Sequence, residues 1–128
     1  MKNKTFISIS FFCNFAYATS EKFIYEKMER DQKRNYFAIQ ETRISDTEEC
    51  RKKTCLAYEI SVGKIKVPAE IEWIPGGVNP TSTLCKKMEG TPKIGYMENR
   101  NEVSLCYFND HIFIFGWDLM KISRKSNR

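Results

Sequence analysis

The stretches NPTSTLCKKMEG (residues 79–90) and EVSLCYFNDHIFIFGW (residues 102–117) carry the local signals that decide the fold. Asn79 can cap a helix that begins at Pro80, a position where no backbone N–H is needed. Gly90 can end such a helix by adopting a positive φ angle. The first stretch therefore predicts a helix between Asn79 and Gly90.

Strands are predicted downstream of this helix. Residues 93–98, 102–108 and 111–117 have strand-like composition, and turn residues separate them at 99–101 and 109–110. In the middle strand, alternation places Val103, Leu105 and Tyr107 on one face and Cys106 on the other. The sequence thus predicts a helix followed by a three-stranded antiparallel meander.

The third predicted strand, residues 111–117, is apolar on both faces. His111, Phe113, Phe115 and Trp117 alternate with Ile112, Ile114 and Gly116. The interpretation we favour is that the helix covers one face and N-terminal strands cover the other, which places Trp117 in the core. The alternative is that Phe113, Phe115 and Trp117 form an exposed aromatic face that binds a partner or a membrane.

The preceding half of the chain is less strongly patterned. We expect an arm or short helix over residues 20–35, then a strand over 36–42. Asp46, with Glu49 three residues later, predicts the start of a short helix. Residues 55–60 and 69–74 look like strands. The fold class expected is α+β: a small disulfide-stabilised domain with short helices on an antiparallel sheet.

Composition sets limits on these interpretations. The chain has 128 residues, 41% of them hydrophobic and 13% aromatic, and a net charge of +5. This is enough apolar material for one folded domain, but the length excludes barrel enzymes built from eight strand-helix units and two-domain dehydrogenases.

The first 18 residues are typical of a secretory signal peptide. Lys2 and Lys4 precede an apolar run over residues 5–15, and Ala16-Tyr17-Ala18 supplies small residues for cleavage. We therefore expect a periplasmic or secreted product. Its residues 19–45 would form an N-terminal arm or helix plus strand, and residues 46–128 a single disulfide-bonded domain.

Four cysteines remain after cleavage: Cys50, Cys55, Cys85 and Cys106. In an oxidising compartment an even number predicts two disulfides, and three pairings can be drawn. A zinc site is the rival interpretation, but the spacing of Cys50 and Cys55 is not that of a zinc knuckle. The helix-to-strand geometry allows Cys85–Cys106, and adjacency favours Cys50–Cys55.

The segment 77–120 resembles a family of short exported bacterial domains of unknown function that often carry a haemolysin label. The resemblance rests on Asn79-Pro80-Thr81-Ser82 with Cys85, on Gly90 and Gly95, on Leu105-Cys106 with Phe108, and on Asp110 and Trp117. Here Asp110-His111 replaces the Asp-Gly turn of the family, and two further cysteines that members tend to carry are missing. Their joint loss implies that they pair with each other, which leaves Cys85 and Cys106 as partners.

No catalytic constellation is predicted. His111 is the sole histidine of the sequence, and the pairs Glu48/Glu49 and Glu70/Glu72 are typical of solvated surfaces. We expect no catalytic residue, metal, cofactor or nucleic-acid partner. The function expected is that of an exported, non-enzymatic binding or inhibitor-type module for an unknown envelope or extracellular protein. A membrane-active, haemolysin-like protein is the alternative.

Overall fold

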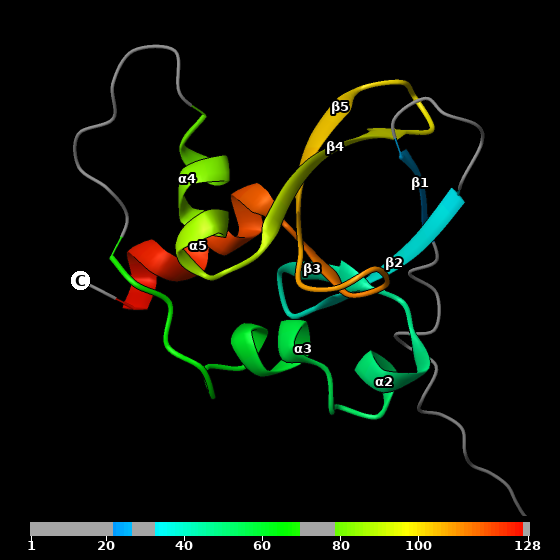
Figure 1. Ribbon diagram of the computed structural model, residues 1–128. Helices are drawn as coiled ribbons and strands as arrows, with labels where there is room; N and C mark the ends of the chain where they lie inside the picture. The colour runs from blue at the N-terminus through cyan, green and yellow to red at the C-terminus, as the bar shows by residue number, and fades with distance from the viewer. Residues whose placement is uncertain (1–21, 27–32, 70–78, 127–128) are drawn as a thin grey trace, which may run out of the picture.

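The described part of the chain, residues 22–26, 33–69 and 79–126 of a computed structural model, contains six antiparallel strands closed into a barrel (Figure 1). The strands are β1 (Lys22–Glu26), β2 (Lys33–Ile39), β3 (Thr42–Ser45), β4 (Thr91–Met97), β5 (Glu102–Tyr107) and β6 (Phe113–Phe115). The accompanying helices are α2 (Glu48–Arg51), α3 (Leu56–Ser61), α4 (Pro80–Lys87) and α5 (Gly116–Ser126). The predicted α+β class, with helices on an antiparallel sheet and two disulfides, is confirmed.

Two three-stranded meanders build the barrel. β1, β2 and β3 form the first, and β4, β5 and β6 form the second. β3 pairs with β6 at Ile44 and Ile114, and β1 pairs with β4 at Tyr25 and Tyr96. Residues 33–45, expected from the sequence to lie ahead of the main domain, therefore supply two strands of the same barrel.

Aromatic side chains fill the interior of the barrel. Tyr36, Leu105, Tyr107, Phe113 and Phe115 form one buried cluster. The ring centroids of Tyr36 and Phe115 lie 4.8 Å apart, and those of Tyr107 and Phe113 lie 5.2 Å apart. Both pairs are tilted, which is a favourable geometry for aromatic rings. The described side chains of the interior therefore form a packed aromatic core.

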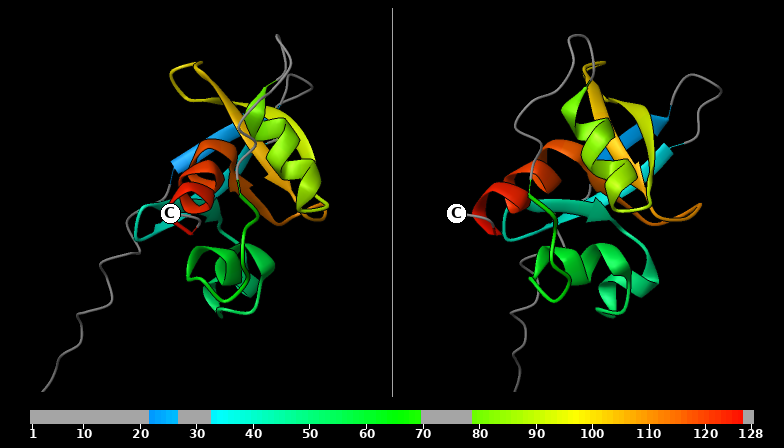
Figure 2. Two further views of the ribbon diagram at one scale, coloured as in Figure 1. Left: turned by 90° about the vertical axis from the view of Figure 1, so that its left-hand side faces the viewer. Right: turned by 60° about the vertical axis from the view of Figure 1, so that its left-hand side comes forward.

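The helices cover the outer faces of the strands, and Figure 2 shows α4 and α5 lying against this wall. A second buried cluster forms here, in which Ile44 and Ile114 from the strands meet Ile60, Leu84 and Leu119 from the helices. The strand β6 is thus covered on both faces, with the N-terminal strand β2 on one side and helices on the other. This is the arrangement that the sequence predicts.

Two disulfides brace this outer layer. Cys85 of α4 is bonded to Cys106 of β5, and Cys50 of α2 is bonded to Cys55 at the start of α3. Both are the pairs expected from the sequence. The first spans 21 residues, a loop whose closure stabilises a fold by about 3 kcal/mol.

Helix α4 follows the local signals closely at its start. The side chain of Asn79 accepts a hydrogen bond from the Thr81 N–H at 2.9 Å, and Pro80 occupies the first turn. At the other end Glu89, and not Gly90, takes the positive φ angle of 66°. Gly90 is needed for space instead, because a Cβ there would lie 2.5 Å from the Cys106 sulfur and 3.0 Å from the Cys85 sulfur.

The predicted strand over residues 55–60 is wrong, because this segment forms helix α3. Its apolar run fits either structure over so short a length. The helix is decided by packing and capping: Ala57 and Ile60, three residues apart, are both buried, and the Cys55 sulfur accepts a hydrogen bond from the Tyr58 N–H at 3.2 Å.

The predicted strand over residues 111–117 is too long, since β6 ends at Phe115 and α5 begins at Gly116. The backbone turns where it passes close to two other elements. A Cβ on Gly116 would lie 3.0 Å from the Cβ atoms of both Ser104 and Thr81. As a result Trp117 is not in the core, contrary to the interpretation favoured by the sequence.

The N-terminal half requires further corrections. Residues 22–26 and 33–35 are strands, not a helix, and a turn at Gln40 interrupts the strand expected over 36–42. Helix α2 is capped by Thr47, one residue after the expected Asp46. The predicted signal peptide, residues 1–18, and residues 70–74 of the strand expected over 69–74 lie outside the described residues.

Replacing Gly90 with alanine tests the packing of the disulfide. The added methyl group would overlap the sulfur atoms, so we expect Gly90→Ala to lower the free energy of unfolding by about 1–3 kcal/mol in a urea titration. In a background carrying Cys85→Ala and Cys106→Ala the same change should cost less. An equal cost in both backgrounds would show that the disulfide is not the obstacle.

Candidate functional site

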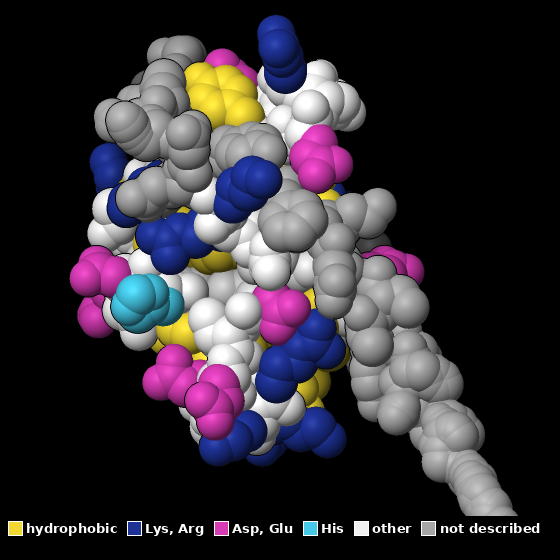
Figure 3. All heavy atoms as spheres, turned by 90° about the vertical axis from the view of Figure 1, so that its right-hand side faces the viewer, with side chains coloured by type: hydrophobic (Ala, Val, Ile, Leu, Met, Phe, Trp, Pro, Cys, Tyr) yellow, Lys and Arg dark blue, Asp and Glu magenta, His cyan; other side chains and the backbone are white. Residues whose placement is uncertain are grey.

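The sole histidine lies beside a charged hollow of about 520 Å³ near the start of α2. Figure 3 shows this face, with basic and acidic side chains around the histidine. His111 is exposed, and its backbone N–H donates to the Asn109 side chain at 2.7 Å. The hydroxyl of Ser45, which also lines the hollow, accepts the Phe113 N–H at 3.1 Å. No hydrogen bond within the described residues joins the imidazole to this hydroxyl, so a Ser-His pair is not formed.

The carboxylates considered for acid-base chemistry are engaged in ion pairs or exposed to solvent. Glu48 pairs with Lys52 at 2.9 Å, and Asp46, which the sequence predicts only as a helix cap, binds Arg51 at 2.8 and 2.9 Å. Glu49 is exposed, and Glu70 and Glu72 lie outside the described residues. Across the part of the chain that is described, no group of three potential ligands is placed to hold a metal ion.

The three aromatic residues proposed as a binding face do not lie together. Phe113 and Phe115 are buried inside the barrel, at 1% and 2% exposure, whereas 47% of Trp117 is exposed. The strand alternation that would align them ends at Gly116, where the chain enters α5. Only Trp117 is therefore available for contact with a partner.

Trp117 lines a groove of about 260 Å³ where β4 and β5 approach the start of α5, which we call the Trp117 groove. Its other lining residues are Arg43, Asn79, Ile94, Glu102, Val103, Ser104 and Phe115. Ile94 is 41% exposed, and within the described residues it and Trp117 are the exposed large hydrophobic side chains.

Several elements fix the walls of the Trp117 groove. The Asn79 amide donates to the Ser104 hydroxyl at 3.5 Å while its oxygen caps α4. Ile94 stands on β4, directly paired with Ser104 on β5. Secondary structure and the cap of α4 thus hold both polar and apolar groups of the groove.

An ion pair anchors the opposite wall. Arg43 donates to the Asp118 carboxylate through its backbone N–H at 2.9 Å, its Nε at 2.9 Å and its Nη2 at 3.0 Å. Asp118 is 2% exposed and the Arg43 side chain is 38% exposed. The guanidinium carbon also lies 4.3 Å from the centre of the Phe115 ring.

The surroundings of this ion pair favour the charged form of Arg43 and the neutral form of the nearby Tyr36. The side-chain hydrogen bonds to Asp118 raise the pKa of Arg43, and burial opposes this in part. Burial raises the pKa of Tyr36, against an opposing effect of the Arg43 charge. The groove therefore presents a permanent cation at neutral pH.

The Trp117 groove combines side chains of the kinds that protein interfaces use. A half-exposed indole and an aliphatic side chain can bury apolar area against a partner, while Arg43 and the Asn79 amide supply directional donors. Tryptophan and arginine are the residue types that dominate binding energy at protein interfaces. A groove of this size holds one or two partner side chains.

Sequence reasoning identified Trp117 but missed Arg43, Asn79 and Ile94 as its neighbours. Asn79 was recognised only as a helix cap. The strand alternation of residues 93–98 carried a signal for Ile94, because an outward-facing isoleucine on a barrel strand leaves apolar surface exposed. Arg43 had no local signal, since its partner Asp118 is 75 positions away.

Comparison with known proteins adds no relative: no family model, curated protein or solved structure matches this chain. Among the described helices, none combines the length and apolar character required for crossing a membrane.

Truncating Trp117 should have little effect on stability, because about half of the side chain is already in water. We expect Trp117→Ala to lower the free energy of unfolding by about 1 kcal/mol or less. Leu119→Ala, two residues along the same helix and fully buried, should cost about 2–5 kcal/mol. Thermal melts of the two variants beside the wild type check this. A larger loss for Trp117→Ala than for Leu119→Ala would contradict the placement of the indole.

Replacing Arg43 alone should lower the free energy of unfolding more than replacing Arg43 and Asp118 together. Arg43→Met leaves a buried carboxylate without its cation, a situation that costs about 3–5 kcal/mol for fully buried pairs. Because Arg43 is 38% exposed, we expect a smaller loss. Adding Asp118→Leu should restore part of the stability, as measured by urea unfolding. A double variant less stable than Arg43→Met would contradict the proposed role of the unpaired charge.

Proposed function

We propose that this chain is an exported, non-enzymatic binding or inhibitor-type module, and that the Trp117 groove is its contact surface for an envelope or extracellular protein. The observation that carries the proposal is the exposure of Trp117 and Ile94 beside Arg43, on a wall that the ion pair of Arg43 with the buried Asp118 holds in place. Preorganised side chains bind with a smaller loss of conformational entropy.

Support for a periplasmic or secreted location comes from the disulfides and from the signal-like residues 1–18. Disulfides persist in oxidising compartments, and both pairs here join elements of a small domain. Such bracing is also typical of small exported binding and inhibitor scaffolds, because it supplies rigidity that a small core lacks.

Burial of Phe113 and Phe115 favours a protein partner over the membrane-active alternative. That alternative, suggested by the haemolysin-like resemblance of residues 77–120, relied on an aromatic strand in contact with lipid. With two of its three aromatic rings inside the barrel, the remaining apolar contact area is the small one of Trp117 and Ile94. An interface hot spot needs only a few such side chains.

Photo-crosslinking from within the groove tests the proposal. A photoreactive amino acid at position 94, incubated with envelope and extracellular fractions of the source cells, should capture a discrete protein. Unlabelled wild-type protein should compete for this capture, whereas unlabelled Trp117→Ser should not, because it lacks the indole. The same photoreactive group at position 52, where the Lys52 side chain is 68% exposed just after α2, serves as the positional control.

Two results would count against the proposal. One is capture of the same proteins from positions 94 and 52, and the other is equal competition by wild type and Trp117→Ser. Leakage of dye from anionic liposomes that is lost in Trp117→Ser would instead favour the membrane-active alternative.

A further inference from the structure

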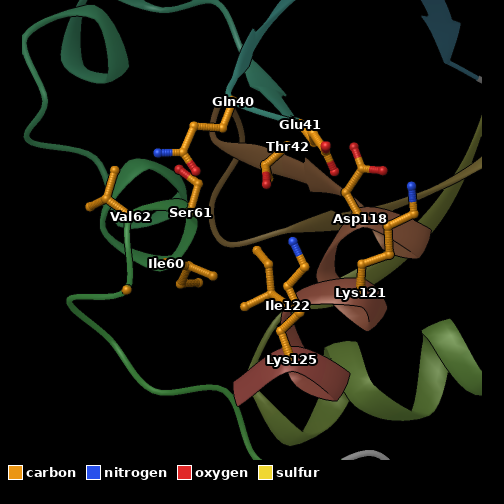
Figure 4. Close-up of a pocket in the computed structure, with 11 residues that line it drawn as sticks. Gln40, Glu41, Thr42, Ile60, Ser61, Val62, Asp118, Lys121, Ile122 and Lys125 are labelled. Carbon is orange, nitrogen blue, oxygen red and sulfur yellow. The ribbon is translucent and has the colours of Figure 1, made fainter. Parts of the chain in front are cut away.

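A third hollow, a cavity of about 320 Å³, is lined by Asp118, whose ion-pair partner Arg43 lines the Trp117 groove. The turn between β2 and β3, the end of α3 and one face of α5 enclose it, and Figure 4 shows the side chains that line it. It belongs to none of the sites considered above. Its volume is at the lower end of the range for small-molecule pockets, so a compact ligand would fit.

The charge balance within this cavity is positive. Lys121 and Lys125 are four residues apart on α5 and both line the cavity. The Asp118 carboxylate is already neutralised by Arg43. Neither lysine, nor the nearby Glu41, forms a salt bridge with any described residue. Two ammonium groups therefore face one uncompensated carboxylate.

These charges are separated within the cavity. In Figure 4, Glu41 and Lys121 lie at one end, next to Asp118. The ammonium group of Lys125 points into the centre of the cavity, toward the side where Gln40 and Ser61 project from the opposite wall. The central part thus has the Lys125 ammonium group on one side and the polar side chains of Gln40 and Ser61 on the other, and an ammonium group in such a polar setting can bind an anionic oxygen.

Gln40 supports a ligand-binding role through its backbone. It is the first residue of the two-residue turn between Ile39 and Thr42, and its φ angle is 59°. Glycine is favoured at positions with positive φ, and another residue there carries a conformational cost. The Gln40 side chain, which a glycine at this position would lack, projects into the cavity.

One wall of the cavity is apolar. Val62 directly follows α3 and Ile122 lies on α5, and both side chains are partly exposed, whereas Ile60, which also lines the cavity, is fully buried. The Ser61 hydroxyl donates to the Tyr58 carbonyl at 2.9 Å, so its proton is already used within the protein. A ligand with a short branched or flat hydrocarbon body would bury this wall while its charged end meets Lys125 and Gln40.

From these features we infer that the cavity binds a small organic monocarboxylate with a short apolar body. Lys125 and the Gln40 amide bind the carboxylate, Lys121 adds to the positive potential, and Val62 and Ile122 contact the hydrocarbon. This inference is independent of the proposed protein-binding function, because no residue of the Trp117 groove contacts the ligand.

Titration of the full chain with isovalerate, followed through backbone amide chemical shifts, tests the inference. We expect saturable shifts at Gln40, Ser61 and Lys125. The uncharged isostere isovaleramide should bind at least about tenfold more weakly, because it lacks the charge that Lys125 recognises. Inorganic phosphate, which has the charge but no apolar body, should also bind more weakly.

Variants separate recognition from structure. Lys125→Met keeps most of the aliphatic stem and should weaken isovalerate binding about tenfold or more, whereas Lys87→Met, an exposed change on α4, should leave it unchanged. Gln40→Gly should relieve the backbone cost and keep or raise the melting temperature, yet weaken binding. If Gln40 had only a structural role, Gln40→Gly would not weaken isovalerate binding while the melting temperature is kept or raised.

Three results would overturn the inference. The first is the absence of any shift at about 10 mM isovalerate, where a millimolar site is already mostly filled. The second is equal binding of isovalerate and isovaleramide. The third is an equal effect of Lys125→Met and Lys87→Met, since a general loss of surface charge would explain it.

Discussion

The ion pair between Arg43 and Asp118 determines how the C-terminal helix meets the barrel. Asp118 stands in the first turn of α5 and receives three hydrogen bonds from one residue of β3. Because a buried carboxylate is tolerated only with such partners, this contact fixes both the start and the rotation of the helix. Leu119 then faces the core and Trp117 faces outward. Arg43 lines the groove and Asp118 lines the cavity.

The aromatic interior has a consequence for where ligands can bind. Tyr36, Tyr107, Phe113 and Phe115 pack together in the space inside the barrel. Hollows arise instead where helices and turns meet the strand wall. The disulfide between Cys85 and Cys106 secures one such junction by joining α4 to β5, the elements that also position the cap and strand residues of the Trp117 groove.

Features with local causes could be predicted from the sequence, and features with distant causes could not. Helix α4 was predictable because Asn79 and Pro80 act within one turn, and β4 and β5 because alternation is a short-range pattern. Helix α3 was misread, since six residues with mixed polarity do not distinguish a period of 3.6 from one of 2. The start of α5 depends on Arg43, 75 positions away from Asp118, and barrel closure pairs strands from opposite halves of the chain. For this reason the sequence predicts Trp117 in the core, whereas the structure places it at the surface.

The ionisable groups of the described residues differ in how far the fold already engages them. A catalytic group must be positioned yet available, with a proton or electron pair not already committed to the fold. In the described part of the chain, the carboxylates of Asp118 and Asp46 are each bound by an arginine, and His111 is exposed with no hydrogen-bonding partner for its imidazole. The groups that remain available, Trp117 and the lysines of α5, are those that contribute by contact and charge. Binding requires that such groups be held still, and a small barrel braced by an ion pair and two disulfides provides this rigidity.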